Sequence, residues 1–367
     1  MHHHHFDNDN IVHNIIFSHG RAAEMVEQQT NVTVTLGNQR NPLSPLVGKK
    51  IYSSMCIPKL LYGLEACVLN EECLLVVETA HRYCARKLQG LPPQTPIVVP
   101  LATLGLQTIE SMLHCNKMMM LYSWLSLPFS CIYKKVVIAR LVYHLTDTGS
   151  HLGALYEALQ LCRQYGIDEY IVRALETGQT MSKAKWKRMV HGVVKERELV
   201  RWELTVPLYS SIPLFRECIT SISVSVWWHV SQCRPHLTRA TRILVRLLCG
   251  QHGLATSTAR YRNANRGHVV PQSRLCTLCD LDVPETVEHF LFGCSRLNML
   301  REILLMNLEM LPNMYIHMSS LNVTEKTVFL LSGMGGKFIV EWLDTYTSIA
   351  NFVFQMYIHR HNLVAQV

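Results

Sequence analysis

Three cysteines and one histidine stand close together in the sequence with the spacing of a metal site. Cys276 and Cys279 form a C-x2-C pair, and His289 and Cys294 complete the pattern C-x2-C-x9-H-x4-C within nineteen residues. The first pair directs two sulfurs at one point, and the second pair can reach that point from a turn or a helix start. Three thiols and one imidazole leave no open coordination position, so the spacing predicts a structural Zn²⁺ site.

The remaining cysteines offer an alternative explanation for the motif. A chain with thirteen cysteines can contain a C-x2-C pair by accident, because free cysteine is among the residue types most often buried. The other ten form no second cluster and stand in apolar surroundings, which predicts reduced core residues and a nuclear or cytoplasmic location. They are Cys56, Cys67, Cys73, Cys84, Cys115, Cys131, Cys162, Cys218, Cys233 and Cys249.

Length and composition predict a globular chain outside the membrane. Its 367 residues are 49% hydrophobic, which is sufficient for two or three domains with buried cores. No run of about eighteen apolar residues is present, so we expect no membrane span. The histidines at 2–5 are followed by polar residues, so we expect no signal peptide either.

Arginine is concentrated just before the metal motif, in a segment without acidic residues. No Asp or Glu occurs between Cys218 and Cys279, although the whole chain has a net charge of +8. The guanidinium group binds phosphate at two points and stacks on bases, so the segment predicts contact with RNA or DNA. A solvated helix face is the alternative. The arginines are Arg234, Arg239, Arg242, Arg246, Arg260, Arg262, Arg266 and Arg274.

A second basic cluster opens a predicted amphipathic helix that continues to Glu203. The cluster consists of Lys183, Lys185, Lys187 and Arg188. Positive charge at a helix start opposes the helix dipole, which indicates an external anion as its partner. Solvated lysines are again the alternative.

Apolar residues recur mostly at helical spacing, and few alternating runs are long enough for a sheet, so the predicted fold is mostly all-α. Pro58 is expected to end a helix that begins near Leu46. Gly90 is expected to end the next helix, which Asn70 can cap at its start. The segment 251–272 is predicted to be a basic loop. The arginines of the helix predicted over 236–249 are expected to point mostly outward. Further helices are predicted over about 107–124, 132–144, 152–165, 168–176, 236–249, from Cys294 to Met310, and 326–361 with a break at Gly333, Gly335 and Gly336.

Four segments in order, 45–52, 57–65, 88–92 and 101–106, resemble the region after the catalytic palm in reverse transcriptases of non-LTR (LINE-type) retrotransposons. The segment 182–186 and the C-x2-C-x9-H-x4-C motif are similar to the C-terminal part of the same polyproteins, where a CCHC zinc motif lies near the end. The resemblance covers about 45–311.

The resemblance implies a zinc-binding role for Cys276, Cys279, His289 and Cys294, but it does not bring a polymerase centre. Such a centre needs carboxylates clustered to hold two metal ions, and the chain has no Asp-Asp pair among its seven aspartates. We therefore predict a non-enzymatic C-terminal portion of such a protein.

The expected organisation has five parts. A poorly ordered lead-in, 1–40, precedes a bundle-like, thumb-like helical region at 41–178 and a linker helix at 179–215. The arginine-rich helix and a small CCHC zinc-knuckle domain occupy 216–311, and a helical segment at 312–367 closes the chain.

Two functional hypotheses remain open. The first is a nucleic-acid-binding module that contacts element RNA or target DNA, with a polymerase chain of the same element as a further partner. The second is a helical protein-interaction module whose zinc site is purely structural. A weaker third hypothesis is an enzyme that acts only when a separate polymerase chain supplies the aspartates. Steep salt dependence of binding to RNA or DNA would distinguish the first from the second.

Overall fold

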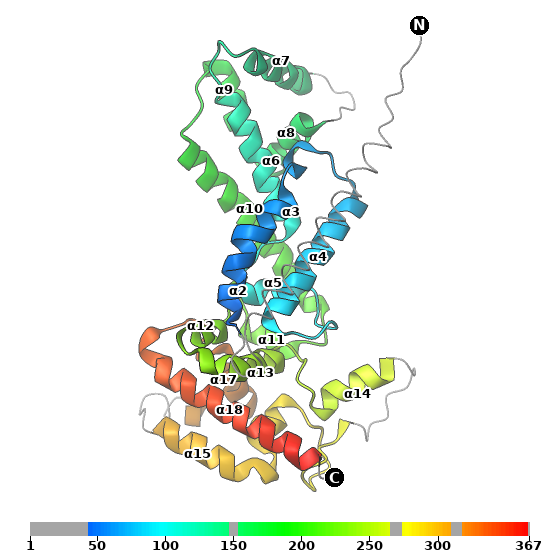
Figure 1. The fold of residues 1–367 in the computed structure, drawn as a ribbon, viewed down its shortest axis with the longest axis vertical. Coiled ribbons are helices and arrows are strands. Elements are labelled where there is room, and N and C mark those ends of the chain that lie inside the picture. Colours follow the sequence, from blue (N-terminus) through cyan, green and yellow to red (C-terminus); the bar gives the residue numbers. More distant parts are fainter. Residues whose placement is uncertain (1–42, 147–152, 265–273, 310–317, 366–367) are drawn as a thin grey trace. The chain divides into compact units, whose positions relative to one another are not determined.

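The computed structural model describes residues 43–146, 153–264, 274–309 and 318–365, and within these ranges the chain is built from helices (Figure 1). The only β-type pairing among them is an isolated bridge between Leu275 and Pro284. The predicted all-α class is therefore confirmed. The predicted lead-in, 1–40, lies outside the described residues. In the described part of the chain, no helix combines the length and the apolar character needed to cross a membrane.

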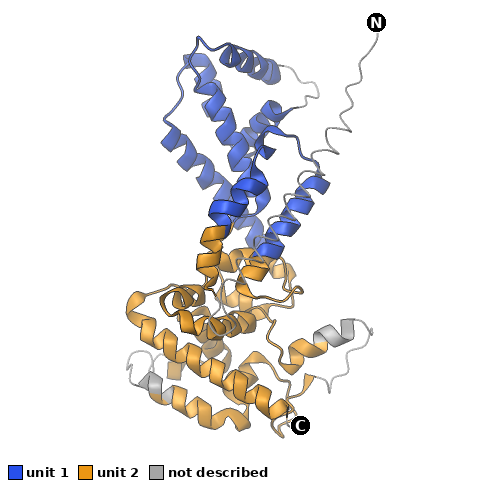
Figure 2. Cartoon of the chain, viewed as in Figure 1, with its two compact units in different colours: residues 1–29, 52–84, 107–204 blue, residues 30–51, 85–106, 205–367 orange. Residues whose placement is uncertain are grey.

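The chain forms two compact units, which are described separately (Figure 2). Among the described residues, unit 1 contains 52–84 and 107–204, and unit 2 contains 43–51, 85–106 and 205–365. Unit 1 thus draws on the predicted 41–178 and 179–215 segments, and unit 2 includes parts of the predicted 216–311 and 312–367 segments. The five-part division itself stays a prediction.

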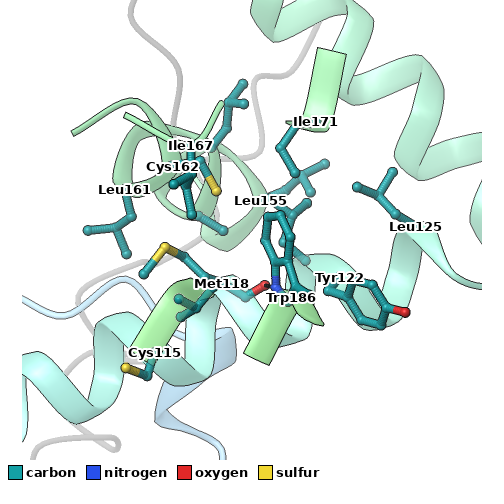
Figure 3. Close-up of a cluster of buried hydrophobic side chains, with 14 of the residues drawn as sticks. Cys115, Met118, Tyr122, Leu125, Leu155, Leu161, Cys162, Ile167, Ile171 and Trp186 are labelled. Carbon is teal, nitrogen blue, oxygen red and sulfur yellow. Dashed lines mark hydrogen bonds between the residues drawn. The ribbon is translucent and has the colours of Figure 1, made fainter. Parts of the chain in front are cut away.

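Unit 1 is a set of helices packed around a tryptophan. Helix α6 packs against α7 and α8, and Trp186, near the start of α10, belongs to the same cluster of buried side chains (Figure 3). Its ring stacks on Tyr122 at 5.8 Å, and its Nε1 donates a hydrogen bond to Met118 O at 3.1 Å. The elements are η1 (Tyr52–Cys56), α3 (Ile57–Leu61), η2 (Leu64–Ala66), α4 (Glu71–Gln89, up to residue 84), α6 (Ile109–Leu125), α7 (Ile132–Thr146), α8 (Ala154–Gln164), α9 (Glu169–Thr177) and α10 (Lys183–Thr205).

The helices predicted over 107–124, 132–144, 152–165 and 168–176 are present as α6 to α9. Local signals explain this success, since Thr108 caps α6 by accepting from Ser111 N. The predicted helix end at Pro58 is wrong. Pro58 lies in the first turn of α3, after the π-helical turn η1, where its missing N–H is not required.

Unit 2 is organised around α12 and α13. Helix α12 buries Trp227 and Trp228, and their Nε1 atoms donate to Leu331 O at 2.7 Å and to Gln89 Oε1 at 3.0 Å. Helix α13 packs against α12 and α18, and α15 lies beside α18. The elements are α2 (Pro45–Ile51), the end of α4, α5 (Val98–Leu104), η3 (Val206–Leu208), α11 (Pro213–Cys218), α12 (Val226–Cys233), η4 (Pro235–Leu237), α13 (Thr238–Leu248), α14 (Ala255–Ala264), η6 (His289–Gly293), η7 (Ser295–Leu297), α15 (Asn298–Glu309), α17 (Val323–Ser332), η8 (Val340–Trp342) and α18 (Leu343–Val364).

The predicted break in the last helical stretch is confirmed. Helix α17 ends at Gly333, whose φ of 76° and whose closeness to Val226 exclude a larger side chain. The predicted loop over 251–272 is wrong for Ala255–Ala264, which form α14. The N-terminus of α14 is satisfied by a carboxylate from a distant segment, which no local pattern reveals.

The ten cysteines outside the motif lie in the described ranges and form no disulfide there, and seven of them are buried as predicted. The prediction is wrong for Cys67 and Cys131, which are half-buried, and for Cys233, which is exposed near the end of α12.

Candidate metal centre

The four predicted ligands converge in unit 2 as a group that can hold a metal ion. The donor atoms of Cys276, Cys279, His289 and Cys294 all lie within 4.8 Å of one another. The Sγ atoms of Cys276 and Cys294 are 4.0 Å apart, and Cys279 Sγ is 3.5 Å from His289 Nε2. A tetrahedral centre with bonds of about 2.3 Å to sulfur and about 2.0 Å to nitrogen separates its ligand atoms by roughly 3.5–3.8 Å. The two measured separations are close to this requirement.

Two short turns supply the ligands. Cys276 and Cys279 come from a bend between Leu275 and Pro284, whose bridge is closed by the hydrogen bond from Cys276 N to Val283 O at 2.9 Å. Asp282 completes the return of the chain with a left-handed φ of 49°. The sequence therefore folds this stretch into a tight ribbon that brings both sulfurs to one side.

The π-helical turn η6 carries the other two ligands at its two ends. His289 begins the turn, and Cys294 N donates to His289 O at 2.7 Å, which fixes the distance between the two residues. A Cβ at position 293 would meet His289 Nδ1 at 3.0 Å, so Gly293 leaves space for the imidazole ring. The x4 spacing of the motif thus corresponds to one wide helical turn.

The site is shielded from water on its apolar side. The three cysteines are buried and His289 is half-buried, while Val287, Phe290 and Leu291 are at most 4% exposed. Burial raises the pKa of Cys276, and it raises the pKa of Cys294 to about 12 together with the neighbouring thiols. Burial also lowers the pKa of His289. Buried thiols this close ionise only when a cation balances their charge, so a metal ion would replace their protons.

A buried ion pair holds the metal loop to the last helix. Glu285 lies between the second and third ligands, and its two carboxylate oxygens accept from Arg360 Nε and Nη2 of α18 at 2.7 Å each. The two side chains are only 2% and 6% exposed. Glu285 also accepts from Ala255 N at 2.6 Å and so caps α14. One carboxylate therefore connects the metal loop with two helices.

Two further contacts support the π-helical turn. Arg301 of α15 donates to Leu291 O at 2.9 Å and to Cys294 O at 3.1 Å. Phe290 packs edge-on against Tyr357 of α18, and Tyr357 Oη donates to His252 O at 2.9 Å. Sequence analysis missed Glu285, Arg301 and Arg360, because a single charge outside a motif carries no signal of a distant partner.

The predicted arginines do not form one outward-facing surface. Arg234 is half-buried and pairs with Asp344 at 3.3 Å, whereas Arg239 is exposed. The predicted outward orientation is wrong for Arg242 and Arg246, which are half-buried. Arg274 is exposed beside the metal loop. The side chains of Arg260, Arg262 and Arg266 lie outside the described residues.

These orientations follow from a nearby helix end. Arg246 donates to Gly90 O, the residue that ends α4, through Nε at 3.1 Å and Nη2 at 2.5 Å. Arg242 lies against the same glycine. The free carbonyls of a helix C-terminus attract cations, which draws both side chains inward.

The lysine cluster lies in unit 1. Helix α10 begins at Lys183 as predicted, and Lys183, Lys185, Lys187 and Arg188 are all exposed. Trp186 between them is buried, which fixes the direction in which the charged side chains point. The two predicted cationic regions therefore belong to different units.

No other cluster of at least three Cys, His, Asp or Glu side chains in the described ranges can hold a metal ion. Comparison of the chain with protein-family models, with curated proteins and with solved structures found no match.

Proposed function

We propose that this chain is a zinc-binding, nucleic-acid-binding protein similar to the C-terminal portion of a LINE-type reverse transcriptase and without a polymerase centre of its own. The convergence of the donor atoms of the four predicted ligands within 4.8 Å of one another is the observation that carries the proposal. This convergence supports a metal-binding role for the C-x2-C-x9-H-x4-C motif. The motif is also the most specific part of the resemblance to LINE-type reverse transcriptases.

Zinc is the ion that suits these donors best. Soft thiolates together with imidazole favour Zn²⁺ over ions that prefer oxygen, and a shell of four such donors matches the usual coordination number of Zn²⁺. With all four positions taken by protein, the ion has no place for a substrate. Its role is to fix the loop that carries the four ligands.

The cationic surfaces are the proposed contacts for RNA or DNA. The first six residues of α10 expose four positive side chains, and its first turn has no acidic residue, although acidic residues are favoured at a helix start. Exposed Arg239 and Arg274 add charge in unit 2. Phosphate groups of RNA or DNA would attract these exposed charges.

The test uses the full chain loaded with zinc and a short labelled single-stranded RNA or DNA duplex in fluorescence anisotropy. We expect binding that weakens steeply between ~50 mM and ~200 mM salt, as counterion release requires. Lys183→Glu with Lys185→Glu should weaken it, whereas Arg173→Glu, an exposed arginine of α9 outside the proposed contacts, should have a smaller effect.

Absence of binding by the folded, zinc-loaded chain would refute the proposal and favour the protein-interaction alternative. One observation suits that alternative. Helix α7 exposes Ile132, Tyr133, Val136 and Tyr143 by 53–71% of their surface, and helical spacing puts them on one face.

A further inference from the structure

Helix α7 of unit 1 carries a coiled-coil pattern on its exposed side (Figure 1). The residues that form this seam are Ile132, Val136, Ala139 and Tyr143, at spacings of four, three and four residues. Such spacings are the a/d repeat of a coiled coil. All four residues are exposed, and Ile132, Val136 and Tyr143 each expose more than half of their surface. The seam therefore faces solvent.

The opposite side of α7 holds the helix to unit 1. Leu141 is fully buried in the cluster that contains Trp186, and Val137 and Leu145 pack against that cluster. Lys134 is buried on this side as well, with its Nζ 4.2 Å from the centre of the Phe129 ring. The core contacts of α7 thus come from residues outside the seam.

The charges of α7 that flank the seam are all positive. Helix α7 contains no Asp or Glu. With Val136 at an a position of the heptad, Lys135 occupies a g position and Arg140 an e position, and both side chains are exposed. Residues at e and g determine the choice of partner in a coiled coil, because they face the e and g residues of the other helix.

A second copy of α7 does not suit this surface. In a parallel pair of copies, Lys135 of one helix would face Arg140 of the other. In an antiparallel pair, g faces g and e faces e, so only positive and uncharged side chains meet there too. Like charges repel, whereas carboxylates at the same positions of another helix would attract Lys135 and Arg140. Charge complementarity therefore favours a partner helix with acidic flanks.

We propose that the seam of α7 is a docking site for an amphipathic helix of another protein, with apolar residues at a and d and Glu or Asp at e and g. Ala139 lies within the seam, where its small side chain lets the axis of a second helix come close. Two heptads form a small interface, so the complex is of the transient class. The seam is separate from the proposed nucleic-acid contacts, and docking does not depend on them.

The first arm of the test measures binding of a labelled helical peptide to the zinc-loaded full chain by fluorescence anisotropy. The probe is a three-heptad peptide with isoleucine or leucine at a and d and glutamate at e and g. One control peptide has lysine at e and g, and the other has the composition of the probe in scrambled order. The glutamate peptide should bind roughly 4- to 30-fold more tightly than the lysine peptide, because each flanking contact changes from attraction to repulsion. The scrambled peptide should bind more weakly than the probe, since it has no seam.

Variants of the chain locate the binding on α7. Lys135→Glu with Arg140→Glu should reverse the preference, so that the lysine peptide binds more tightly than the glutamate peptide. Val136→Ser should weaken binding of the glutamate peptide roughly tenfold through lost apolar burial, with an unchanged melting temperature because the side chain is exposed. Arg173→Glu, an exposed arginine of α9, should bind the glutamate peptide as wild type does.

The second arm tests the other possible occupants of the seam. Sedimentation velocity of the full chain at rising concentration detects self-association, and flotation with vesicles of phosphatidylserine and phosphatidylcholine in equal parts detects membrane binding. Either behaviour, if Val136→Ser abolishes it and the glutamate peptide does not bind, would overturn the proposal and assign the seam to a second copy or to a lipid surface. Equal binding of all three peptides, or undiminished binding of the glutamate peptide by Val136→Ser, would also overturn it.

Discussion

Breaking the Glu285–Arg360 pair should destabilise unit 2 more than any other single change to a described ion pair of that unit. The carboxylate and the guanidinium share two hydrogen bonds of 2.7 Å and are 2% and 6% exposed. Arg360→Met keeps an apolar stem, and among the described residues it leaves the Glu285 carboxylate with the Ala255 amide as its donor. An uncompensated buried charge of this kind costs about 3–5 kcal/mol. At about 2–4 °C per kcal/mol for a unit of this size, the melting temperature should fall by roughly 6–20 °C.

The assay is urea denaturation of the zinc-saturated chain followed by circular dichroism. The pair Arg234–Asp344 offers a matched control in the same unit, because its side chains are 43% and 93% exposed. Arg234→Met should cost less than about 1 kcal/mol, as surface pairs usually do. In the double variant Glu285→Gln with Arg360→Met the buried charge is gone, so its cost should be below the sum of the single costs by about 1–3 kcal/mol. If Arg360→Met costs no more than Arg234→Met, the pair does not hold the metal loop to α18 and the reasoning fails.

Further outcomes are expected from three other perturbations. Chelation of the metal, or Cys279→Ser, should lower the free energy of unfolding by several kcal/mol, since a zinc site of this kind contributes on the order of 10 kcal/mol. As a control, Cys233→Ser at an exposed cysteine should leave the melting temperature unchanged. Burial lowers the pKa of His81 to about 4 from 6.5, so the unfolded chain binds the proton first and about 3 kcal/mol of stability should be lost as pH falls from 6.5 to 4. The difference in urea midpoint between wild type and His81→Gln should therefore shrink with falling pH, and a constant difference would contradict this. Lys183→Glu with Lys185→Glu should stabilise α10 by about 0.3–1 kcal/mol per residue through the helix dipole while it weakens RNA binding, and a parallel loss of both would indicate misfolding instead.

The features that sequence analysis predicted are those fixed by neighbours in the chain. The four ligands lie within nineteen residues, and short turns with defined hydrogen bonds bring them together. The helices α6 to α9 follow from the spacing of their apolar residues and from the residues that end them. The break after α17 follows from Gly333, because glycine adopts the left-handed φ of 76° without strain. In each case the information is local.

The features that were missed depend on contacts between distant segments. Glu285 and Arg360 are 75 residues apart, and nothing near either residue specifies the other. The sequence pattern predicts a loop where α14 forms, because the N-terminal amide of α14 is satisfied by Glu285 and not by a capping residue of its own. Arg242 and Arg246 were expected in solvent because arginine usually is exposed, but the end of α4 lies beside them. Tertiary electrostatics overrode the local expectation in all of these positions.

The contacts around the metal loop also determine how it should be studied. The predicted boundary at 311/312 separates the four ligands from α18, yet Arg360 and Tyr357 of α18 contact the loop directly. A fragment that ends at residue 311 would leave the Glu285 carboxylate without its partner and Phe290 without its packing surface. Its behaviour would then report the loss of α18 as much as the presence of zinc. Because the metal ion and the ion pair stabilise the same short loop, each can be judged only in a chain that retains the other.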